Sequence, residues 1–198
     1  MSSRDSILRD LRRNAPTLSP LPTVPAGVEY DDPQRQFEEV FTSVGGRCVH
    51  VPDAAALKAQ VASLDVYANA RTIASLVDAI DSRNLDPATI ADPHQLADVD
   101  VAVLPAEFGV AENGAVWIPG SALGPNRAVF VIAQYLVIVL NASEIVSNMH
   151  QAYERVQIER PGFGLFLSGP SKTADIEQSL VIGAHGARSC TLFLVGSP

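Results

Sequence analysis

Cysteine is scarce in this chain of 198 residues, which contains only Cys48 and Cys190. The two thiols lie in separate segments typical of β-strands, and neither has a partner at the spacing of a metal site. This excludes a zinc or iron–sulfur centre held by cysteines of the chain itself, so we expect no intrinsic metal or cofactor. We interpret both residues as buried thiols in a reducing cytoplasm, where structural disulfides are rare.

Long apolar runs and basic runs are also missing. The longest apolar stretch, 128–140, is interrupted by Gln134 and is too short for a bilayer span, which takes about 20 residues. The first residues carry charges without an apolar segment after them, which predicts no secretory signal. The formal net charge is −8, and no cluster of lysine and arginine offsets it. These features argue against a membrane span and against a nucleic-acid partner.

Two common nucleotide-binding motifs are missing as well. The sequence has no Gly-x-Gly-x-x-Gly run for a dinucleotide. The pair Lys172–Thr173 is similar to the end of a phosphate-binding P-loop, but such a loop needs glycine directly before the lysine and again five residues earlier. Those positions hold Ser171 and Phe166, so the P-loop interpretation fails.

The beginning of the chain is predicted to form an arm. Ile7, Leu8 and Leu11 fall on one face among charged residues, which is typical of a short amphipathic helix. An extended linker follows, marked by four prolines, Pro16, Pro20, Pro22 and Pro25. We therefore divide the chain into an arm, 1–33, and an α/β domain, 34–198. The helix is expected to pack either on another chain or on its own domain.

Helical and strand patterns alternate from residue 34 onward. Helices are predicted over 34–44, 54–64, 145–156 and 174–182, with Asp53 and Asn141 as candidate N-caps. Strands are predicted over 48–51, 99–104, 115–118, 136–140, 165–168 and 190–195, while 72–77 fits either state. This alternation implies a three-layer α/β fold with a mainly parallel sheet covered by helices on both faces.

The segment 109–117 contains the first candidate site. Asn113–Gly114 between two apolar runs predicts a tight turn, because both residues tolerate positive φ. Glu112 comes directly before that turn, and its small neighbours leave it accessible. A carboxylate in this position could act as a nucleophile or general base. The alternative is a solvated glutamate at a hairpin tip.

The segment 168–177 contains the second candidate site. An apolar strand leads through Gly169–Pro170 into Ser171, Lys172 and Thr173, and an amphipathic segment follows. This pattern predicts a helix start whose N–H groups, together with Lys172, bind an anion. Asp175 falls in the first helical turn, where it favours the helix dipole and can be structural only. The alternative is a capped helix with an exposed lysine.

His185 belongs to the same candidate site, because it lies between glycines in the turn 183–188. An imidazole in such a turn could bind an oxyanion or move a proton. Parallel α/β sheets gather ligands beyond the carboxyl ends of their strands. We therefore expect Glu112, Lys172, Thr173 and His185 to approach one cleft at that edge of the sheet.

At these residues the chain resembles the lactate-utilisation proteins of the C type, which contain a LUD domain. The runs 169–177 and 183–186 are similar to the C-terminal signature of that family, and the resemblance is strongest over 99–195. Two positions depart from the family pattern. Proline is usual where this chain has Ala187, which loosens the turn that aims His185, and threonine is common where it has Asn113.

The resemblance implies a function as well as a fold. The family shares its broad fold with CoA transferases and sugar-phosphate isomerases, and Asn113 makes the turn similar to the Ser-Glu-Asn-Gly loop of family I CoA transferases, whose glutamate is the nucleophile. The implied role is a cytoplasmic component of a multi-protein system that oxidises L-lactate to pyruvate. Iron–sulfur clusters are then expected only in partner subunits, and this chain would have no independent activity.

The leading hypothesis is therefore an accessory component that binds a small anionic ligand. The residues expected to bind it are Gly169, Ser171, Lys172, Thr173, Asp175, His185 and Asn113. The alternative is an acyl or CoA transferase with Glu112 as nucleophile. The expected partners are the iron–sulfur subunits and the anionic ligand, and a homo-oligomer stays open. A scaffold without a ligand would leave these polar residues without a role.

Overall fold

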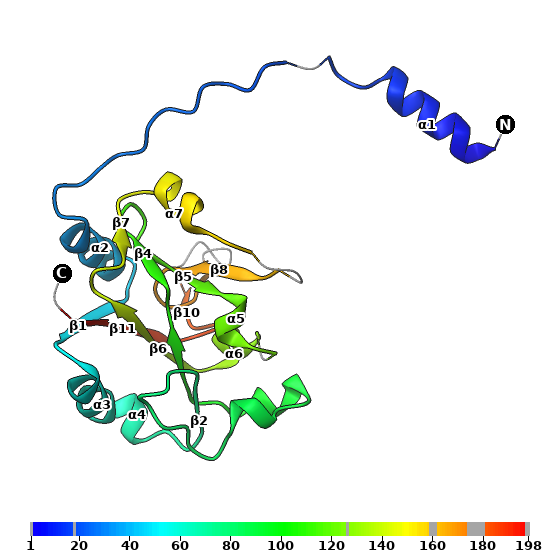
Figure 1. Ribbon diagram of the computed structural model, residues 1–198. Coiled ribbons are helices and arrows are strands. Elements are labelled where there is room, and N and C mark those ends of the chain that lie inside the picture. The colour runs from blue at the N-terminus through cyan, green and yellow to red at the C-terminus, as the bar shows by residue number, and fades with distance from the viewer. Residues whose placement is uncertain (1, 18, 126, 159–161, 174–180, 197–198) are drawn as a thin grey trace.

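The centre of the fold is a five-stranded parallel sheet, shown in a computed structural model that describes all residues except 1, 18, 126, 159–161, 174–180 and 197–198 (Figure 1). Its strand order is β1-β11-β6-β3-β2, and every neighbouring pair is parallel. The strands are β1 (Arg47–Val51), β2 (Ile73–Ser75), β3 (Val101–Pro105), β6 (Tyr135–Asn141) and β11 (Ser189–Val195). The predicted α/β class with a mainly parallel sheet is confirmed, and the ambiguous segment 72–77 contains a strand.

A second, four-stranded sheet packs beside the first and has the order β7-β4-β5-β8. Its strands are β4 (Phe108–Val110), β5 (Ala115–Pro119), β7 (Ile145–Val146) and β8 (Gly164–Leu167). Strand β5 runs antiparallel to both β4 and β8, whereas β4 and β7 are parallel. The sequence analysis placed β5 and β8 as strands but did not predict a separate sheet, because β4 and β7 are too short to show a strand pattern.

The helices of the domain pack on and between the two sheets, whereas the helix of the arm has no buried residue. The described α-helices are α1 (Ser3–Arg13), α2 (Pro33–Ser43), α3 (Ala54–Ala62), α4 (Asp65–Ala68), α5 (Gly120–Leu123), α6 (Val129–Ile132) and α7 (Met149–Arg155). Two 3₁₀ segments, η1 (Pro87–Thr89) and η2 (Pro93–Leu96), lie between β2 and β3. The predicted cap at Asp53 is confirmed, since its side chain accepts a hydrogen bond from the N–H of Ala56 at 2.8 Å.

Three apolar clusters hold these layers together. In Figure 1, α3 and α4 lie below the parallel sheet, whereas the second sheet and α7 lie above it. The cluster below contains Leu57 and Val61 of α3 with one face of the strands. The largest cluster fills the space between the sheets and contains Phe37 and Phe41 of α2, both fully buried. A third cluster joins the second sheet to Ala152 of α7.

Two predicted helices are wrong at their described residues. Val181–Ile182, expected to end a helix that began at 174, form β10, which pairs antiparallel with β9 (Lys172–Thr173). The rest of that predicted helix, including Asp175, lies outside the described residues. Ile145–Val146 form strand β7 because the chain must run beside β4 before turning into a helix. That helix, α7, begins only at Met149.

The helix caps around α7 differ from the prediction in the same way. Asn141 caps no helix, since its Oδ1 accepts hydrogen bonds from the N–H and the hydroxyl of Ser143, at 3.0 and 2.9 Å. The N-cap of α7 is Asn148, whose Oδ1 accepts from the N–H of Gln151 at 3.1 Å. The Asn141–Ser143 contacts form a local turn of the kind that short polar side chains favour.

The arm is helical where the sequence predicts a helix, and no residue of α1 is buried. A linker connects α1 to the domain, and the described parts of the arm extend away from the two sheets (Figure 1). The arm contacts the domain near its end, where the side-chain amide of Asn148 donates to the carbonyl of Val28 at 2.9 Å. The N–H of Tyr30 donates to the hydroxyl of Ser147 at 3.3 Å. None of the described helices has the length and apolar character needed to cross a membrane.

Replacing Phe37 by alanine tests the role of α2 between the sheets. Its ring is fully buried and lies 5.8 Å from the ring of Phe41, centroid to centroid. We expect Phe37→Ala to lower the free energy of unfolding by about 3–5 kcal/mol, because it leaves a cavity between the sheets. Denaturant titration measures this loss, and Glu39→Ala on the exposed face of α2 should change it by less than about 0.5 kcal/mol. Equal effects of the two substitutions would contradict the packing described.

Candidate functional site

A cavity of about 270 Å³ lies beside the amino ends of β6 and β11. Four segments line it: α6, the start of β6, the strand β8 with the turn after it, and the turn before β11. The lining residues are Phe130, Val131, Leu136, Leu165, Phe166, Leu167, Ser168, Gly169, Pro170, Ser171, His185, Gly186 and Ala187. Aliphatic and aromatic side chains therefore form most of the wall, and two serine hydroxyls and an imidazole supply its polar side-chain groups.

The turn after β8 is held in place by close backbone contacts. Gly169 has φ +70°, and a Cβ there would lie 3.0 Å from the carbonyl oxygen of Val44 at the end of α2. The hydroxyl of Ser168 donates to the carbonyl of Asn113 at 3.0 Å. The N–H of Ser171 donates to the carbonyl of Ala187 at 2.9 Å. These contacts fix one wall of the cavity against α2, the β4–β5 turn and the segment before β11.

The opposite wall is the turn that contains His185. A Cβ on Gly186 would lie only 3.0 Å from Cβ of Ser171, so the glycine lets the two walls approach closely. The N–H of Arg188 donates to the carbonyl of Gln134 at 2.8 Å, which ties the turn to the chain entering β6. Ala187, one of the two departures from the family pattern, is buried and still lines the cavity.

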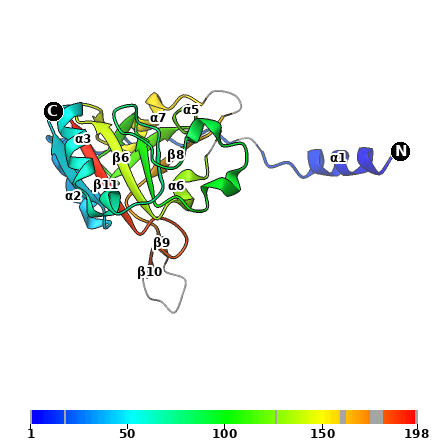
Figure 2. The same cartoon turned by 90° about the horizontal axis from the view of Figure 1, so that it is seen from below.

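Lys172 and Thr173 lie beyond the rim of the cavity rather than in its wall. They form β9, pair with β10, and project from the body of the domain (Figure 2). The predicted helix start, with N–H groups aimed at an anion, is therefore not what these two residues form. Lys172 is exposed and directly follows Ser171, and the exposed Arg188 directly follows Ala187. Basic residues thus flank both walls in a chain of net charge −8.

Glu112 has a structural contact that the sequence analysis did not predict. Its Oε2 accepts a hydrogen bond from the N–H of Met149 at 2.9 Å, and its own N–H donates to the carbonyl of Ser147 at 3.0 Å. The carboxylate therefore lies at the first turn of α7, where a negative charge is favourable. Asn113–Gly114 ends the turn 111–114 between β4 and β5, and Gly114 has positive φ, +62°, whereas Asn113 does not.

The expected sharing of one cleft is only partly found. Gly169, Ser171 and His185 line the cavity together, whereas its described lining includes neither Glu112 nor Asn113, and neither Lys172 nor Thr173. The expected position at the carboxyl ends of the parallel strands is wrong. Strand β8 belongs to the second sheet, where it runs antiparallel to β5. The turn after β8 lines the cavity beside the amino ends of β6 and β11, not their carboxyl ends.

Two groups of residues were missed by sequence reasoning. Phe130, Val131 and Leu136 line the cavity, and their only signal is membership of the apolar run 128–140. Asn148 was missed as a cap, although an asparagine before an apolar helical pattern is a usual start signal. Within the ranges that the structure describes, His, Cys, Asp and Glu form no group that could hold a metal ion.

Both thiols are free, Cys190 is buried and Cys48 is partly buried. Burial, with a smaller contribution from the nearby charge of Glu38, raises the pKa of Cys48 to about 12. Burial also raises the pKa of Cys190, with a smaller contribution from Cys48. Both residues are therefore protonated at neutral pH and poorly reactive.

Two substitutions of Glu112 separate its helix contact from a catalytic role. We expect Glu112→Ala to lower the free energy of unfolding by about 0.5–1 kcal/mol, because the N–H of Met149 loses its acceptor. Glu112→Gln keeps an oxygen acceptor and should recover most of that loss in thermal denaturation. If the carboxylate of Glu112 were a nucleophile, Glu112→Gln would abolish transferase activity even though the variant keeps its stability.

The pKa of Cys48 predicts the alkaline stability of the fold. A thiol in the unfolded chain ionises near pH 9, whereas folding raises the pKa of Cys48 to about 12. Its contribution to stability is therefore intact below pH 9 and is lost as pH rises from 9 to 12. Between pH 9 and 12 the free energy of unfolding should fall more steeply in the wild-type chain than in Cys48→Val. The difference between the two slopes should be less than about 1.4 kcal/mol per pH unit, because solvent partly screens the thiol. If the free energy of unfolding fell with pH at the same rate in both proteins, the raised pKa of Cys48 would be refuted.

Comparison with known proteins places this chain in a family. A sequence profile of the LUD domain matches residues 78–195. The chain is 35% identical over 123 residues to lactate utilization protein C of Shouchella clausii, an overlap of 59% of this chain and 49% of that protein. It is 33% identical over 98 residues to the protein of the same name from Halalkalibacterium halodurans, covering 46% of this chain and 42% of that one. The chain thus spans about half the length of these relatives.

A solved structure shows the same fold. The crystal structure of a DUF162 family protein from Deinococcus radiodurans superimposes with a TM-score of 0.60 at 17% sequence identity, covering 86% of this chain and 100% of that one. The matched profile runs from before β3 to the end of β11 and includes every segment that lines the cavity. Because that profile covers more than half of its residues, the chain belongs to the LUD domain family.

Proposed function

We propose that this chain is an accessory component of a lactate-utilisation system and that it binds a small carboxylate or another small anion in the cavity. The observation that carries the proposal is the convergence of Ser171 and His185 on one apolar cavity from separate segments of the chain. The names of the relatives from Shouchella clausii and Halalkalibacterium halodurans support the choice of system.

The composition of the cavity suits a short anion with an apolar part. Leu136 and Leu165 offer a surface for a methyl group or a short hydrocarbon chain. The hydroxyl of Ser171 and the imidazole of His185 can donate hydrogen bonds to a carboxylate. The volume of about 270 Å³ is close to the lower limit for ligand sites, so it favours a small ligand.

The basic residues beside the cavity support the sign of the ligand charge. Lys172 and Arg188 are exposed and adjoin the two walls, at the base of the β9–β10 pair. An anion approaching this end of the domain therefore meets positive charge even though the chain as a whole is acidic. These side chains would increase the rate at which the anion arrives, and Ser171 and His185 would fix its orientation.

The chain cannot supply the electron acceptor for lactate oxidation from its cysteines. Conversion of a 2-hydroxy acid to a 2-oxo acid releases two electrons and two protons, which an acceptor must take up. Its two cysteines are too few for an iron–sulfur cluster, and burial keeps both protonated. We therefore assign the electron transfer to iron–sulfur partner subunits and the binding of the anion to this chain.

The alternative, an acyl or CoA transferase with Glu112 as nucleophile, has less support. The carboxylate of Glu112 already accepts a hydrogen bond from the N–H of Met149, and Glu112 is not among the residues that line the cavity. A transferase would form a thioester on this carboxylate during turnover. Incubation with an acyl-CoA followed by borohydride should leave Glu112 unmodified if the binding role is correct.

Calorimetric titration of the purified chain with L-lactate, pyruvate and inorganic phosphate tests the proposed site. We expect one of these anions to bind, and Ser171→Ala and His185→Gln each to weaken its binding about 10-fold, since each removes one hydrogen bond to a charged group. His150→Gln is the matched control, because His150 is an exposed histidine on α7 outside the cavity. Binding that is unchanged in both cavity variants would contradict the proposed site.

Purification from the native host tests the proposed system separately. We expect the chain to be recovered in fixed stoichiometry with cysteine-rich iron–sulfur subunits, and growth on lactate to fail when the chain is deleted. Recovery without such subunits, together with normal growth on lactate, would contradict the accessory role even if the cavity binds an anion.

A further inference from the structure

The apolar face of α1 has no partner within the described chain. Ile7 is 59% exposed and Leu11 is 64% exposed, and both project from a helix with no buried residue. The helix start is well specified, because Ser2 and Asp5 form a reciprocal capping box. Its 11 residues are nevertheless fewer than the about 12–15 that an isolated helix needs to persist in water. A docking surface would supply the missing stabilisation.

The charge of α1 identifies the kind of surface that it fits. Residues 1–14 contain four arginines and two aspartates, so the rest of the chain carries 10 of the 14 basic and 20 of the 22 acidic residues, a formal charge of −10. Arg12 and Arg13 lie in the last helical turn, next to Leu11. A basic amphipathic helix is attracted to an acidic surface that also has an apolar hollow.

The domain has such a surface at η2. Pro93, His94, Ala97 and Ile132 line a hollow of about 300 Å³, which we call the η2 hollow. Most of its exposed wall is apolar, and Val131, beside Ile132, is 45% exposed. The exposed acidic residues Asp92 and Asp98 adjoin the lining residues in sequence.

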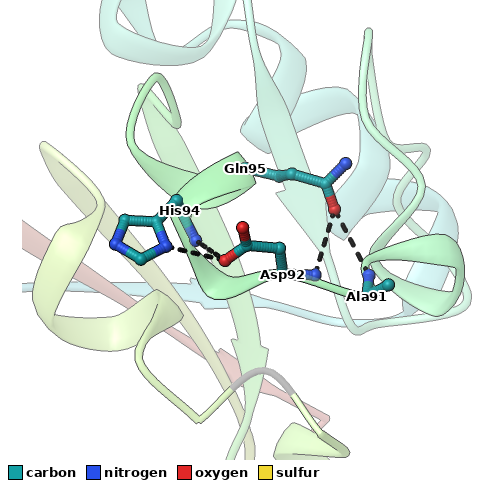
Figure 3. Close-up of polar contacts among 4 residues, drawn as sticks. All are labelled: Ala91, Asp92, His94 and Gln95. Atoms are coloured by element: carbon teal, nitrogen blue, oxygen red, sulfur yellow. Dashed lines mark hydrogen bonds and ion pairs between the residues drawn. The ribbon is translucent and has the colours of Figure 1, made fainter.

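The η2 hollow is braced by local hydrogen bonds (Figure 3). Asp92 accepts from the N–H of His94 at 3.0 Å and contacts Nδ1 of its ring at 2.7 Å. The Gln95 side chain accepts from the N–H groups of Ala91 and Asp92, at 3.2 and 3.3 Å. The segment is therefore ordered before anything docks, which lowers the entropy cost of binding.

The linker favours docking on a second molecule. Val28 and Tyr30 fix the arm to Ser147 and Asn148, directly before α7. The η2 hollow instead follows β2, at the opposite edge of the parallel sheet from β1 and α2. The segment from Asn14 to Gly27 contains four prolines and spans about 40 Å if it is extended at about 3.1 Å per residue. In both views α1 lies away from its own domain (Figures 1 and 2).

We propose that α1 of one molecule docks in the η2 hollow of a second copy of this chain. Leu8 and Leu11 enter the hollow, and Arg12 and Arg13 lie beside Asp92 and Asp98. A two-fold axis makes the exchange reciprocal, so each dimer contains the contact twice. The η2 hollow shares no lining residue with the anion cavity, although Val131 of that cavity is next to Ile132 of the hollow, and this proposal does not depend on the proposed function.

Sedimentation velocity of the full chain over a range of concentrations tests the exchange. We expect a dimer whose dissociation constant rises at least 10-fold in Leu11→Asp and in Ala97→Arg, and also at high salt. Leu21→Asp is the matched control, because Leu21 lies in the linker and is 94% exposed. The thermal midpoint of each variant shows whether its domain stays folded. A wild-type chain that is monomeric throughout, or a Leu11→Asp chain that dimerises normally, would overturn the proposal.

Mixing the two variants distinguishes exchange from every other use of the arm. A Leu11→Asp chain keeps an intact hollow, and an Ala97→Arg chain keeps an intact α1. Their equimolar mixture should contain heterodimers joined by one contact, at concentrations where each variant alone is monomeric. Absence of heterodimers would show that α1 packs on its own domain or on a different protein, and it would overturn the proposal.

Discussion

The contact between α2 and the glycines around it holds the rest of the fold in place. The rings of Phe37 and Phe41 fill the space between the sheets, and a Cβ on Gly46 would lie 2.2 Å from the ring of Phe41. A Cβ on Gly114 would lie 2.8 Å from the backbone nitrogen of Phe41. The β4–β5 turn is therefore seated directly on α2, and the end of α2 supports Gly169 in the wall of the cavity. The site depends on this packing although no α2 side chain lines it.

Most of the parallel sheet could be predicted, because its strands are continuous runs of β-branched and aliphatic residues such as 136–140. The second sheet could not, since β4 is short and pairs with the nearby β5 and with the two-residue strand β7, which lies far along the chain. Turn chemistry singled out Gly169, Ser171 and His185, which line one cavity, and their binding of a ligand stays a prediction. The predicted edge of the sheet was wrong because a local sequence pattern does not determine strand direction. The contact of Glu112 with Met149 joins residues 37 positions apart, beyond the reach of local reasoning.

The arrangement of charge is consistent with the proposed binding of an anion by an acidic protein. Ser171 and the exposed His185 line the cavity with hydrogen-bond donors, while Lys172 and Arg188 lie just outside it. Attraction at the entrance is then combined with a mostly apolar interior, where hydrogen bonds to an anion are stronger than in water. The two thiols remain protonated in their strands and take no part in this chemistry.

The junction between the arm and the domain is closely packed around Gly27 and Asn148. A Cβ on Gly27 would lie 2.5 Å from Cγ of Asn148, and the same side chain binds the carbonyl of Val28 while capping α7. A shift of the arm by one residue would press a side chain into that amide and lose the cap of α7. The end of the arm next to the domain is thus held in one position, and the number of residues between it and α1 sets how far α1 can lie from the domain. Insertions or deletions within 15–26 would change the distance at which α1 is presented while leaving its attachment intact.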